Sequence, residues 1–508
     1  GGGSFGNGKN ITISGGRVLA EASPNAFYGA AGIGGGAIDS SRNDTNGHQE
    51  LDPGADGYNI TITGGDVTAA RSSGAKSNGA GIGGGNYGDG YNIVIDTTGI
   101  VTTSVENSIV LDETGAGIGG GGRGDGYNIE IKNGTVNAYT AVRGAGIGGG
   151  TGGNGYDITI TGGNVKAVAQ DNEGTAGGAG IGGGFEGYGK NITITSKDEL
   201  TKTTVYASGS YHAAGIGGGG STQQYTLTDE NNNEVAYGSV LGSKTYGENI
   251  NIDGYVDVTA LGKYYGAGIG GGGYGYAHNI YIGNDGVKKA DVKVAVRHGD
   301  NNSSKTYGAG IGSGYCGAAI GVEITGNVHV RTAPGTPFYL YSTAFVGSGN
   351  GGPYAANIHI HGKDTTMSTT SSTNNYDSGL AVGAPSGPAV NIRLEDLTSV
   401  TNPDKAGYAL HLYGSSMLIG GRGNFDINTM NPFGDIILSD DVKDYDYVVS
   451  NIKISNSNVF GTCGGDSSGS PAIGGTGGEE GKTAIANIDV TESKLNVNHT
   501  SYYYGGDP

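Results

Sequence analysis

Five side chains that can transfer protons or bind ions stand at equivalent places in three successive copies of one short phrase. The phrase is Asn-Ile-x-Ile, and strand alternation puts both isoleucines on one side of a sheet and the residues after them on the other. These outward places hold Glu323, then His359 and His361, then Arg393 and Glu395. We expect the five to form a patch about 10 Å across, taking two spacings between neighbouring strands.

Two carboxylates of this patch have a spacing that suits the cleavage of polysaccharides. Glu323 and Glu395 are two copies apart, which predicts a backbone separation of roughly 9–10 Å. It permits the carboxylate distance of about 6.5–9.5 Å that inverting glycosidases use. Alternatively, Arg393 or a histidine acts as the base for β-elimination on a uronate, with a carboxylate-bound cation. A third interpretation is a solvated charged face whose neighbours pair across strands.

Metal binding is a weaker prediction at two places. His359 and His361 alternate along one strand, which suits a metal, although no third ligand is evident from the sequence. An acidic segment within residues 421–450 lies close to the patch in the predicted order of repeats, where it either walls one side of a cleft or binds a cation such as Ca²⁺. Its candidate ligands are Asp435, Asp440 and Asp441. No other cofactor is predicted.

A second recurring phrase, Asp-Gly-Tyr-Asn, offers an acidic row and an aromatic row. The acidic residues are Asp56, Asp89 and Asp125, which suggest either a calcium ladder or, with more support, turn-forming aspartates. The tyrosines suit either stacking against sugar rings or simple packing at a corner. The candidate substrate-binding tyrosines are Tyr58, Tyr91, Tyr127 and Tyr281.

The elements that must position these residues are repeats. Gly-Ala-Gly-Ile-Gly-Gly-Gly stands in full at Gly79–Gly85, Gly115–Gly121, Gly144–Gly150, Gly178–Gly184 and Gly266–Gly272. An Asn-Ile-x-Ile strand follows each copy, and a third short strand such as Val136–Ala138 comes next. Three short strands per unit, with no helical periodicity, predict an all-β, right-handed parallel β-helix of about 12–14 coils.

The repeats predict one β-helix domain over residues 1–508. Its coils are regular over about 1–350 and more divergent over 351–508, with insertions at 39–56, 221–248 and 421–450. The recurring Asn is expected to form an internal ladder, in which each buried amide bonds to the next coil. Three of these Asn lie in Asn-x-Thr glycosylation sequons. A eukaryotic secretory protein would risk glycosylating them during folding although they are expected to be buried, so the sequons favour a bacterial source.

Composition narrows the classes of binding partner that this protein can have. The net charge of −19, with 28 Lys and Arg, argues against nucleic acid and anionic membranes. No apolar run approaches the roughly 18 residues of a membrane span, so no membrane insertion is expected. The chain opens in the middle of a repeat with Gly1-Gly2-Gly3-Ser4, so we expect flanking domains of a longer chain.

The alternation of Gly-Ala-Gly-Ile-Gly-Gly-Gly with Asn-Ile-Thr-Ile-Thr-Gly-Gly resembles the repeat regions of large extracellular surface proteins of Gram-positive anaerobic bacteria. In shape the predicted fold also resembles the pectate-lyase-like parallel β-helix superfamily. The repeat resemblance covers about residues 9–350 well and the remainder loosely. It implies a secreted or cell-wall attached protein that contacts polysaccharide or a host glycan, but it identifies no catalytic residue.

Three functions stay open at this point. The leading expectation is a carbohydrate-binding or adhesive module. The alternative is a glycoside hydrolase or polysaccharide lyase with its site on the coils around Glu323–Glu395. A purely structural stalk is the third.

Overall fold

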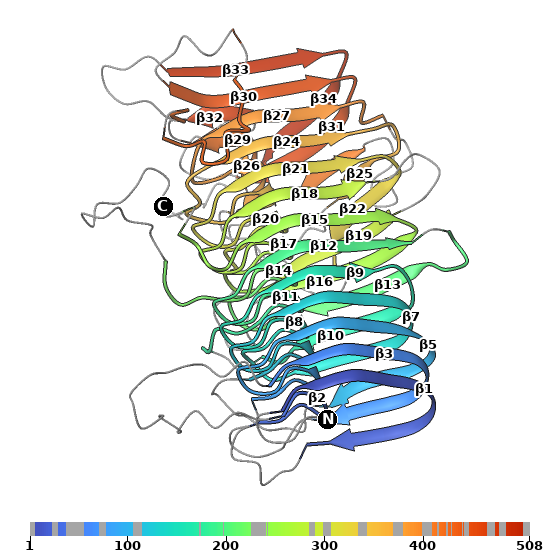
Figure 1. The fold of residues 1–508 in the computed structure, drawn as a ribbon. Helices are drawn as coiled ribbons and strands as arrows, with labels where there is room; N and C mark the ends of the chain where they lie inside the picture. Colours follow the sequence, from blue (N-terminus) through green and yellow to red (C-terminus); the bar gives the residue numbers. More distant parts are fainter. Residues whose placement is uncertain are drawn as a thin grey trace, which may run out of the picture.

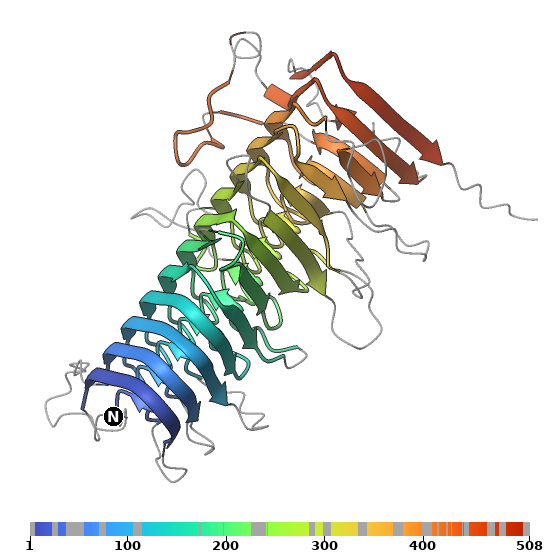
Figure 2. The same ribbon diagram turned by 90° about the vertical axis from the view of Figure 1, so that its right-hand side faces the viewer.

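The protein is a parallel β-helix, as the repeats predict. The computed structural model describes residues 6–22, 29–36, 55–70, 78–104, 114–171, 174–196, 198–224, 240, 242–283, 290–297, 306–333, 343–368, 379–398, 409–413, 416–422, 425–427, 429–438, 440, 447–464, 473–476 and 484–500. The elements whose bounds are described are all β-strands, and they form parallel sheets of 22 and 12 strands. Figures 1 and 2 show the coils stacked in chain order into a rod.

One side of the rod, the Asn-Ile face, carries the Asn-Ile-x-Ile phrases, and the predicted candidate patch lies on it. Its strands are β1 (Gly8–Glu21), β3 (Gly57–Ala70), β5 (Gly90–Ser104), β7 (Gly126–Thr140), β9 (Gly155–Ile160), β12 (Gly189–Ser196), β15 (Gly247–Gly254), β18 (Ala277–Gly283), β21 (Ala319–Thr325), β24 (Ala355–His361), β27 (Ala389–Glu395), β30 (Tyr447–Ser455) and β33 (Ala484–Thr491). Matching isoleucines pair from strand to strand, as Ile129 does with Ile158.

A second side, the Val-Ala face, continues the same sheet around a corner. In the first coils β1, β3, β5 and β7 run through this corner without a break, and in later coils the strand divides in two. The separate strands are β10 (Asn164–Ala169), β13 (Thr203–Ser208), β16 (Val256–Lys263), β19 (Ala290–Arg297), β22 (Val328–Thr332), β25 (Thr366–Ser368), β28 (Leu410–Tyr413), β31 (Asn458–Gly464) and β34 (Lys494–Thr500).

The third side, the Gly-Ile face, is formed by the glycine-rich phrase. Its strands are β2 (Ile33–Gly34), β4 (Ile82–Gly83), β6 (Ile118–Gly119), β8 (Ile147–Gly148), β11 (Ile181–Gly182), β14 (Ile216–Gly217), β17 (Ile269–Gly270), β20 (Ile311–Gly312), β23 (Thr343–Gly347), β26 (Gly379–Ala384), β29 (Ser416–Arg422) and β32 (Ile473–Thr476). They make the sheet of 12 strands, which lies within the predicted range of coils.

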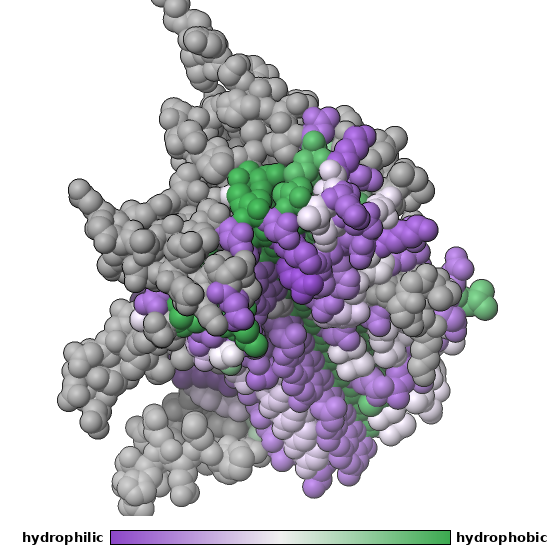
Figure 3. All heavy atoms as spheres, turned by 90° about the horizontal axis from the view of Figure 1, so that it is seen from above, coloured by the Kyte–Doolittle hydropathy of each residue, from purple (hydrophilic) through white to green (hydrophobic). Residues whose placement is uncertain are grey.

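The core is a stack of aliphatic layers inside the three faces. In one coil, Ile129 and Ile131 from the Asn-Ile face meet Val136 and Ala138 from the Val-Ala face and Ile147 from the Gly-Ile face, and all five are buried. The residues between them face outward because side chains alternate along each strand. Figure 3 shows the result as rows of hydrophilic side chains running along the outer surface.

The glycine after each corner isoleucine is required by the backbone. At Gly148 φ is 133°, and a Cβ there would lie 2.0 Å from the carbonyl oxygen of Gly182 in the next coil. The equivalent glycines keep a similar φ in the divergent coils, with 137° at Gly347 and 132° at Gly420. Only glycine adopts this conformation without strain, so it persists where the rest of the phrase has changed.

The recurring Asn does form a ladder, but its predicted position inside the rod is wrong. Asn59 and Asn128 are exposed, at φ values of 53° and 51°. Asn92 donates from Nδ2 to Asn59 Oδ1 at 3.0 Å, and Asn128 donates in the same way to Asn92 at 2.5 Å. Asn is among the few residues that tolerate this left-handed conformation, which turns its side chain outward at the strand's start. The sequon argument for a bacterial source therefore fails, because it needed buried Asn.

The described residues contain no helix long and apolar enough to span a bilayer. Of the predicted insertions, 39–56 lies outside the described residues except for its last two positions, and 221–248 is described only at its two ends. The third insertion is described in part and lies beside the candidate site.

Candidate functional site

Strand register brings the five predicted residues together on the outer side of the Asn-Ile face. Glu323 on β21 stands beside His359 on β24, and His359 stands beside Arg393 on β27. One outward position further along, His361 stands beside Glu395. The register follows from the aligned isoleucines of the same strands, so in-line neighbours could be predicted from the sequence.

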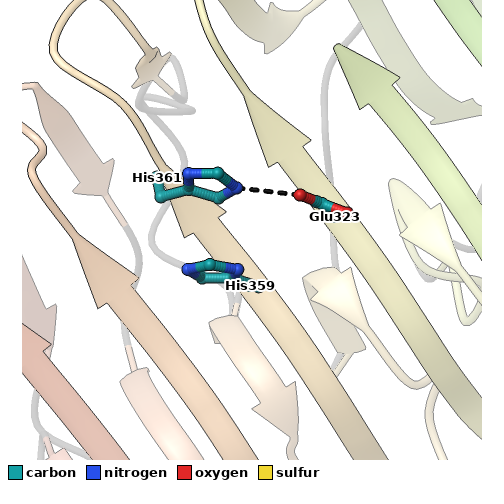
Figure 4. A group of neighbouring side chains, drawn as sticks. All are labelled: Glu323, His359 and His361. Atoms are coloured by element: carbon teal, nitrogen blue, oxygen red, sulfur yellow. Dashed lines mark hydrogen bonds and ion pairs between the residues drawn. The ribbon is translucent and has the colours of Figure 1, made fainter.

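Hydrogen bonds in this patch run diagonally between strands. His361 Nε2 lies 2.9 Å from Glu323 Oε1, and His359 Nε2 lies 2.8 Å from Glu395 Oε2. The two imidazoles stack with ring centroids 3.9 Å apart and planes 15° from parallel. Figure 4 shows the rings one above the other, with Glu323 across from His361. The two carboxylates are thus connected through the stacked histidines.

Lys453 on β30 is a sixth member that the predicted set did not include. Its Nζ lies 2.9 Å from Glu395 Oε1, while an Arg393 guanidinium nitrogen lies 2.6 Å from Glu395 Oε2. The signal was present in the sequence, because Lys453 takes the outward place that follows Arg393. We call Glu323, His359, His361, Arg393, Glu395 and Lys453 the charged patch.

The charges around Glu395 keep it ionised. Burial, with 13% of its side chain exposed, would by itself raise the pKa of this carboxyl, but the hydrogen bond from Lys453 and the charges of Arg393 and Lys453 lower it overall. An ionised carboxylate that accepts three such contacts is suited to holding neighbouring groups in place. It is poorly suited to the general-acid role of an inverting pair.

The surroundings of His359 lower its pKa and so favour its neutral form. Burial lowers the pKa of this imidazole first, and the neighbouring His361 and Arg393 lower it further, while the contact with Glu395 acts in the opposite direction. A neutral imidazole can accept a proton or bind a metal. Its Nε2 is engaged by Glu395, so Nδ1 is the nitrogen with capacity for another partner.

Within the described residues, one set of three side chains comes close enough to hold a metal ion. One potential ligand atom each from Glu323, His359 and His361 lies within 4.8 Å of the other two. The predicted acidic ligands are arranged differently. Asp435 pairs with His278 at 3.1 Å, Asp440 is not part of such a set, and Asp441 lies outside the described residues.

The segment around Asp435 borders the charged patch on one side. The backbone carbonyl of Asp435 accepts a hydrogen bond from the Asn357 side chain at 3.0 Å. The backbone carbonyl of Ile437 accepts a hydrogen bond from the Asn391 side chain at 2.9 Å. Asn357 and Asn391 come two residues before His359 and Arg393 in their strands. Phe433 stacks on His278 at 3.9 Å. The arrangement agrees with a wall beside the patch, one of the two predicted roles of this segment.

The tyrosine row of the early coils uses its ring faces for internal packing. Tyr58, Tyr91, Tyr127 and Tyr156 stack with centroids 4.9 Å apart and nearly parallel planes. Neighbouring rings therefore cover both faces of Tyr91 and Tyr127 and one face of Tyr58, where a sugar would otherwise stack. This geometry favours the packing interpretation for Tyr58, Tyr91 and Tyr127.

The adjacent aspartates form a ladder of turns. Asp56 Oδ1 accepts the backbone N–H of Asp89 at 2.9 Å, and Asp89 Oδ1 accepts that of Asp125 at 2.8 Å. The ladder continues when Asp125 accepts the N–H of Asn154 at 2.7 Å. Burial raises the pKa of Asp89 to about 6, against the effect of its hydrogen bond with Asp125. These contacts favour turn-forming aspartates.

Tyr281 is placed differently from the other predicted tyrosines. It lies on β18 in register with Glu323, at the edge of the charged patch. Its ring and hydroxyl extend across Gly283, within 2.1 Å of the place that a Cβ would occupy there. The ring needs a glycine at this position, and it is partly exposed.

An aromatic cluster at the corner beside the Gly-Ile face was not predicted. It consists of Tyr211, His212, Tyr264, Tyr265, Tyr274, Tyr307 and Tyr315. Tyr265 stacks between His212 at 4.1 Å and Tyr315 at 4.4 Å. Burial lowers the pKa of His212 to about 4, with the carbonyl of Ser221 acting in the opposite direction. The sequence contained a signal for this cluster, because tyrosines are concentrated in the turns on both sides of the glycine phrase.

Four stretches of the chain match the family model described as Beta helix repeat, at residues 11–37, 60–86, 129–151 and 158–185. Each begins in an Asn-Ile strand and ends just past a Gly-Ile strand, so each match spans most of one coil. The chain is a parallel β-helix repeat protein. The matched coils of this β-helix repeat protein precede the charged patch, so the match describes the scaffold. No curated protein and no solved structure matches the chain significantly.

Proposed function

We propose that this β-helix repeat protein engages polysaccharide along the outer side of its Asn-Ile face, as an extracellular binding or adhesive module. The observation that carries the proposal is a continuous strip from Tyr281 to Lys453. It crosses the five adjacent strands β18, β21, β24, β27 and β30. At about 4.8 Å per strand, the strip is long enough for several sugar units.

The strip combines the two kinds of surface that sugars recognise. The Tyr281 ring offers an apolar surface for the C–H groups of a sugar ring. The charged patch offers carboxylate, imidazole, guanidinium and ammonium groups that can bond to sugar hydroxyls. Glu323 and Arg393 are 44% and 49% exposed, so these groups are accessible from solvent.

Rigidity supports recognition at this face. Each strip residue stands on a strand that is bonded to a strand on either side, and Glu395 is fixed by contacts with His359, Arg393 and Lys453. A preorganised surface loses little conformational entropy on binding. The resemblance of the repeats to bacterial surface proteins supports a location outside the cell, where polysaccharide is available.

A second candidate function is cleavage of the bound polysaccharide at the charged patch. The observation that favours it is the neutral His359 beside Arg393, with the lowered histidine pKa described above. Such a pair suits the β-elimination alternative, in which a neutral base meets a uronate near a cation. Because Glu395 is ionised and occupied, this alternative agrees better with the contacts than an inverting carboxylate pair.

One experiment separates these functions. The protein is incubated with a panel of soluble and insoluble polysaccharides, and both retention and release of products are measured. Binding without products supports the module, and products that His359→Ala abolishes support cleavage. For the polysaccharide that binds, Tyr281→Ala should weaken retention about tenfold or more. Tyr58→Ala, which removes a ring from the stacked row, should leave it unchanged.

Retention of no polysaccharide would contradict the proposal and leave the structural stalk. Equal losses for Tyr281→Ala and Tyr58→Ala would also contradict it, because the strip would then have no particular role. Circular dichroism of both variants checks that the coils remain folded.

A further inference from the structure

The charged patch also contains a cluster of possible metal ligands, whose assignment does not rest on sugar binding. We propose that Glu323, His359 and His361 bind one divalent transition-metal ion of the zinc type. The three come from adjacent strands β21 and β24, and one ligand atom from each lies within 4.8 Å of the other two.

The side chains need only a small adjustment to coordinate an ion. Ligand atoms around a tetrahedral zinc are about 3.3 Å apart, given metal–ligand distances of about 2.0–2.1 Å. The Glu323 oxygen already lies 2.9 Å from His361 Nε2. The other distances, which are at most 4.8 Å, would have to shorten to about 3.3 Å, a change that side-chain rotation could supply.

Each histidine also has an outer partner that orients it. His359 Nε2 contacts Glu395 at 2.8 Å, which leaves Nδ1 for the metal. His361 Nδ1 contacts the Thr325 hydroxyl at 3.2 Å, which leaves Nε2. Histidine ligands in metal sites characteristically use their second nitrogen in this way.

A fixed outer shell supports the site. Glu395 is itself held by Arg393 and Lys453, at 2.6 and 2.9 Å, so it can fix the His359 ring without becoming a ligand. Arg393 and Lys453 already neutralise the charge of Glu395, so Glu395 is not available to balance the charge of the ion. Glu323, which pairs with His361, would then supply the compensating negative charge.

The donor set determines the class of metal. Two imidazole nitrogens and one carboxylate oxygen suit zinc, cobalt, nickel and copper ions, whereas calcium and magnesium prefer sets made of oxygen alone. Three protein ligands leave a further position for water or another exogenous group. The histidine side chains are 27% and 29% exposed, so an ion can reach them from solvent.

The test is a calorimetric titration of the chelator-treated full chain with Zn²⁺. Excess Ca²⁺ is present throughout, so that surface carboxylates that bind cations without specificity are already occupied. We expect one Zn²⁺ per chain. His361→Ala and Glu323→Gln should each weaken binding at least about tenfold, and Glu395→Gln should weaken it about tenfold through the His359 ring. Co²⁺ should give visible d–d absorption that His361→Ala removes.

His278→Ala is the matched control, because His278 is also a surface histidine paired with a carboxylate, Asp435. It should leave Zn²⁺ binding unchanged. No saturable binding to the wild-type chain, or equal losses in His278→Ala and His361→Ala, would overturn the proposal. If His361→Ala does not fold, Glu323→Gln answers the same question. Polysaccharide retention is read separately, so failure of the metal site and failure of the proposed function remain distinguishable.

Discussion

At the residue scale, the repeats explain both what could be predicted and what could not. In-register stacking of parallel strands predicted that Glu323, His359 and Arg393 are neighbours, because each occupies the same place in successive copies. The diagonal bonds of the histidines could not be predicted, since they depend on side-chain rotamers. The exposure of the Asn ladder was missed because it follows from a left-handed backbone conformation that strand alternation does not include.

A single corner glycine should be indispensable. Gly148→Ala is expected to destabilise the protein by at least about 2 kcal/mol, because it strains the backbone and drives a Cβ against the carbonyl oxygen of Gly182. Urea denaturation followed by circular dichroism measures the change. Gly15→Ala is the control, because a Cβ at Gly15 meets nothing within 4 Å. Similar midpoints for the two variants would contradict the steric requirement.

The aspartate ladder predicts a stability that depends on pH. The pKa of Asp89 is raised from 3.8 to about 6 in the folded chain, so the stability that the protonated carboxyl contributes is present below pH 3.8 and is lost as pH rises through about 6. Asp89→Asn keeps the acceptor for Asp125 and removes the charge. We expect it to stabilise the protein at pH 8 by about 1–2 kcal/mol, after discounting for screening, and to have little effect near pH 4.

Thermal midpoints of Asp89→Asn and wild type across this pH range test that expectation. Asn154, which occupies the equivalent place and accepts the N–H of Tyr188 at 3.2 Å, shows that an amide fits the ladder. A difference between the two proteins that stays constant from pH 4 to pH 8 would show that the Asp89 charge is not the cause.

At the element scale, ladders outside the core hold neighbouring coils together. Asn92 combines two contributions, because it tolerates a φ of 52° and bonds to both Asn59 and Asn128. The sequence showed the recurrence of Asn but not this division of roles. Gly321 has the same conformation at 67° with no side chain, so backbone tolerance alone suffices at that coil.

Two substitutions at Asn92 separate the contributions. Asn92→Gly keeps the left-handed backbone and loses the side-chain bonds, for an expected cost of about 1 kcal/mol. Asn92→Ala loses both and should cost about 2 kcal/mol or more. Denaturation midpoints give the comparison. If alanine were tolerated as well as glycine, the left-handed backbone would not be a determinant of Asn at this position.

At the scale of the whole molecule, the rod is a regular scaffold on which a few coils differ. The coils that match the Beta helix repeat model present mostly Thr and the stacked tyrosine row outward, whereas β18 to β30 present Tyr281 and the charged patch. The sequence predicted the repeat count and the strand order because the phrases recur at coil spacing. It could not predict the segment at Asp435 lying against His278, since that contact joins residues far apart in the chain.

The central claim is that the strip from Tyr281 to Lys453 binds polysaccharide. Its most direct test is a binding isotherm for the best polysaccharide of the panel, measured with wild type, Tyr281→Ala and the control Tyr58→Ala. We predict that the dissociation constant rises about tenfold or more for Tyr281→Ala and stays at the wild-type value for Tyr58→Ala. Unchanged affinity in Tyr281→Ala, with the coils intact by circular dichroism, would contradict the claim.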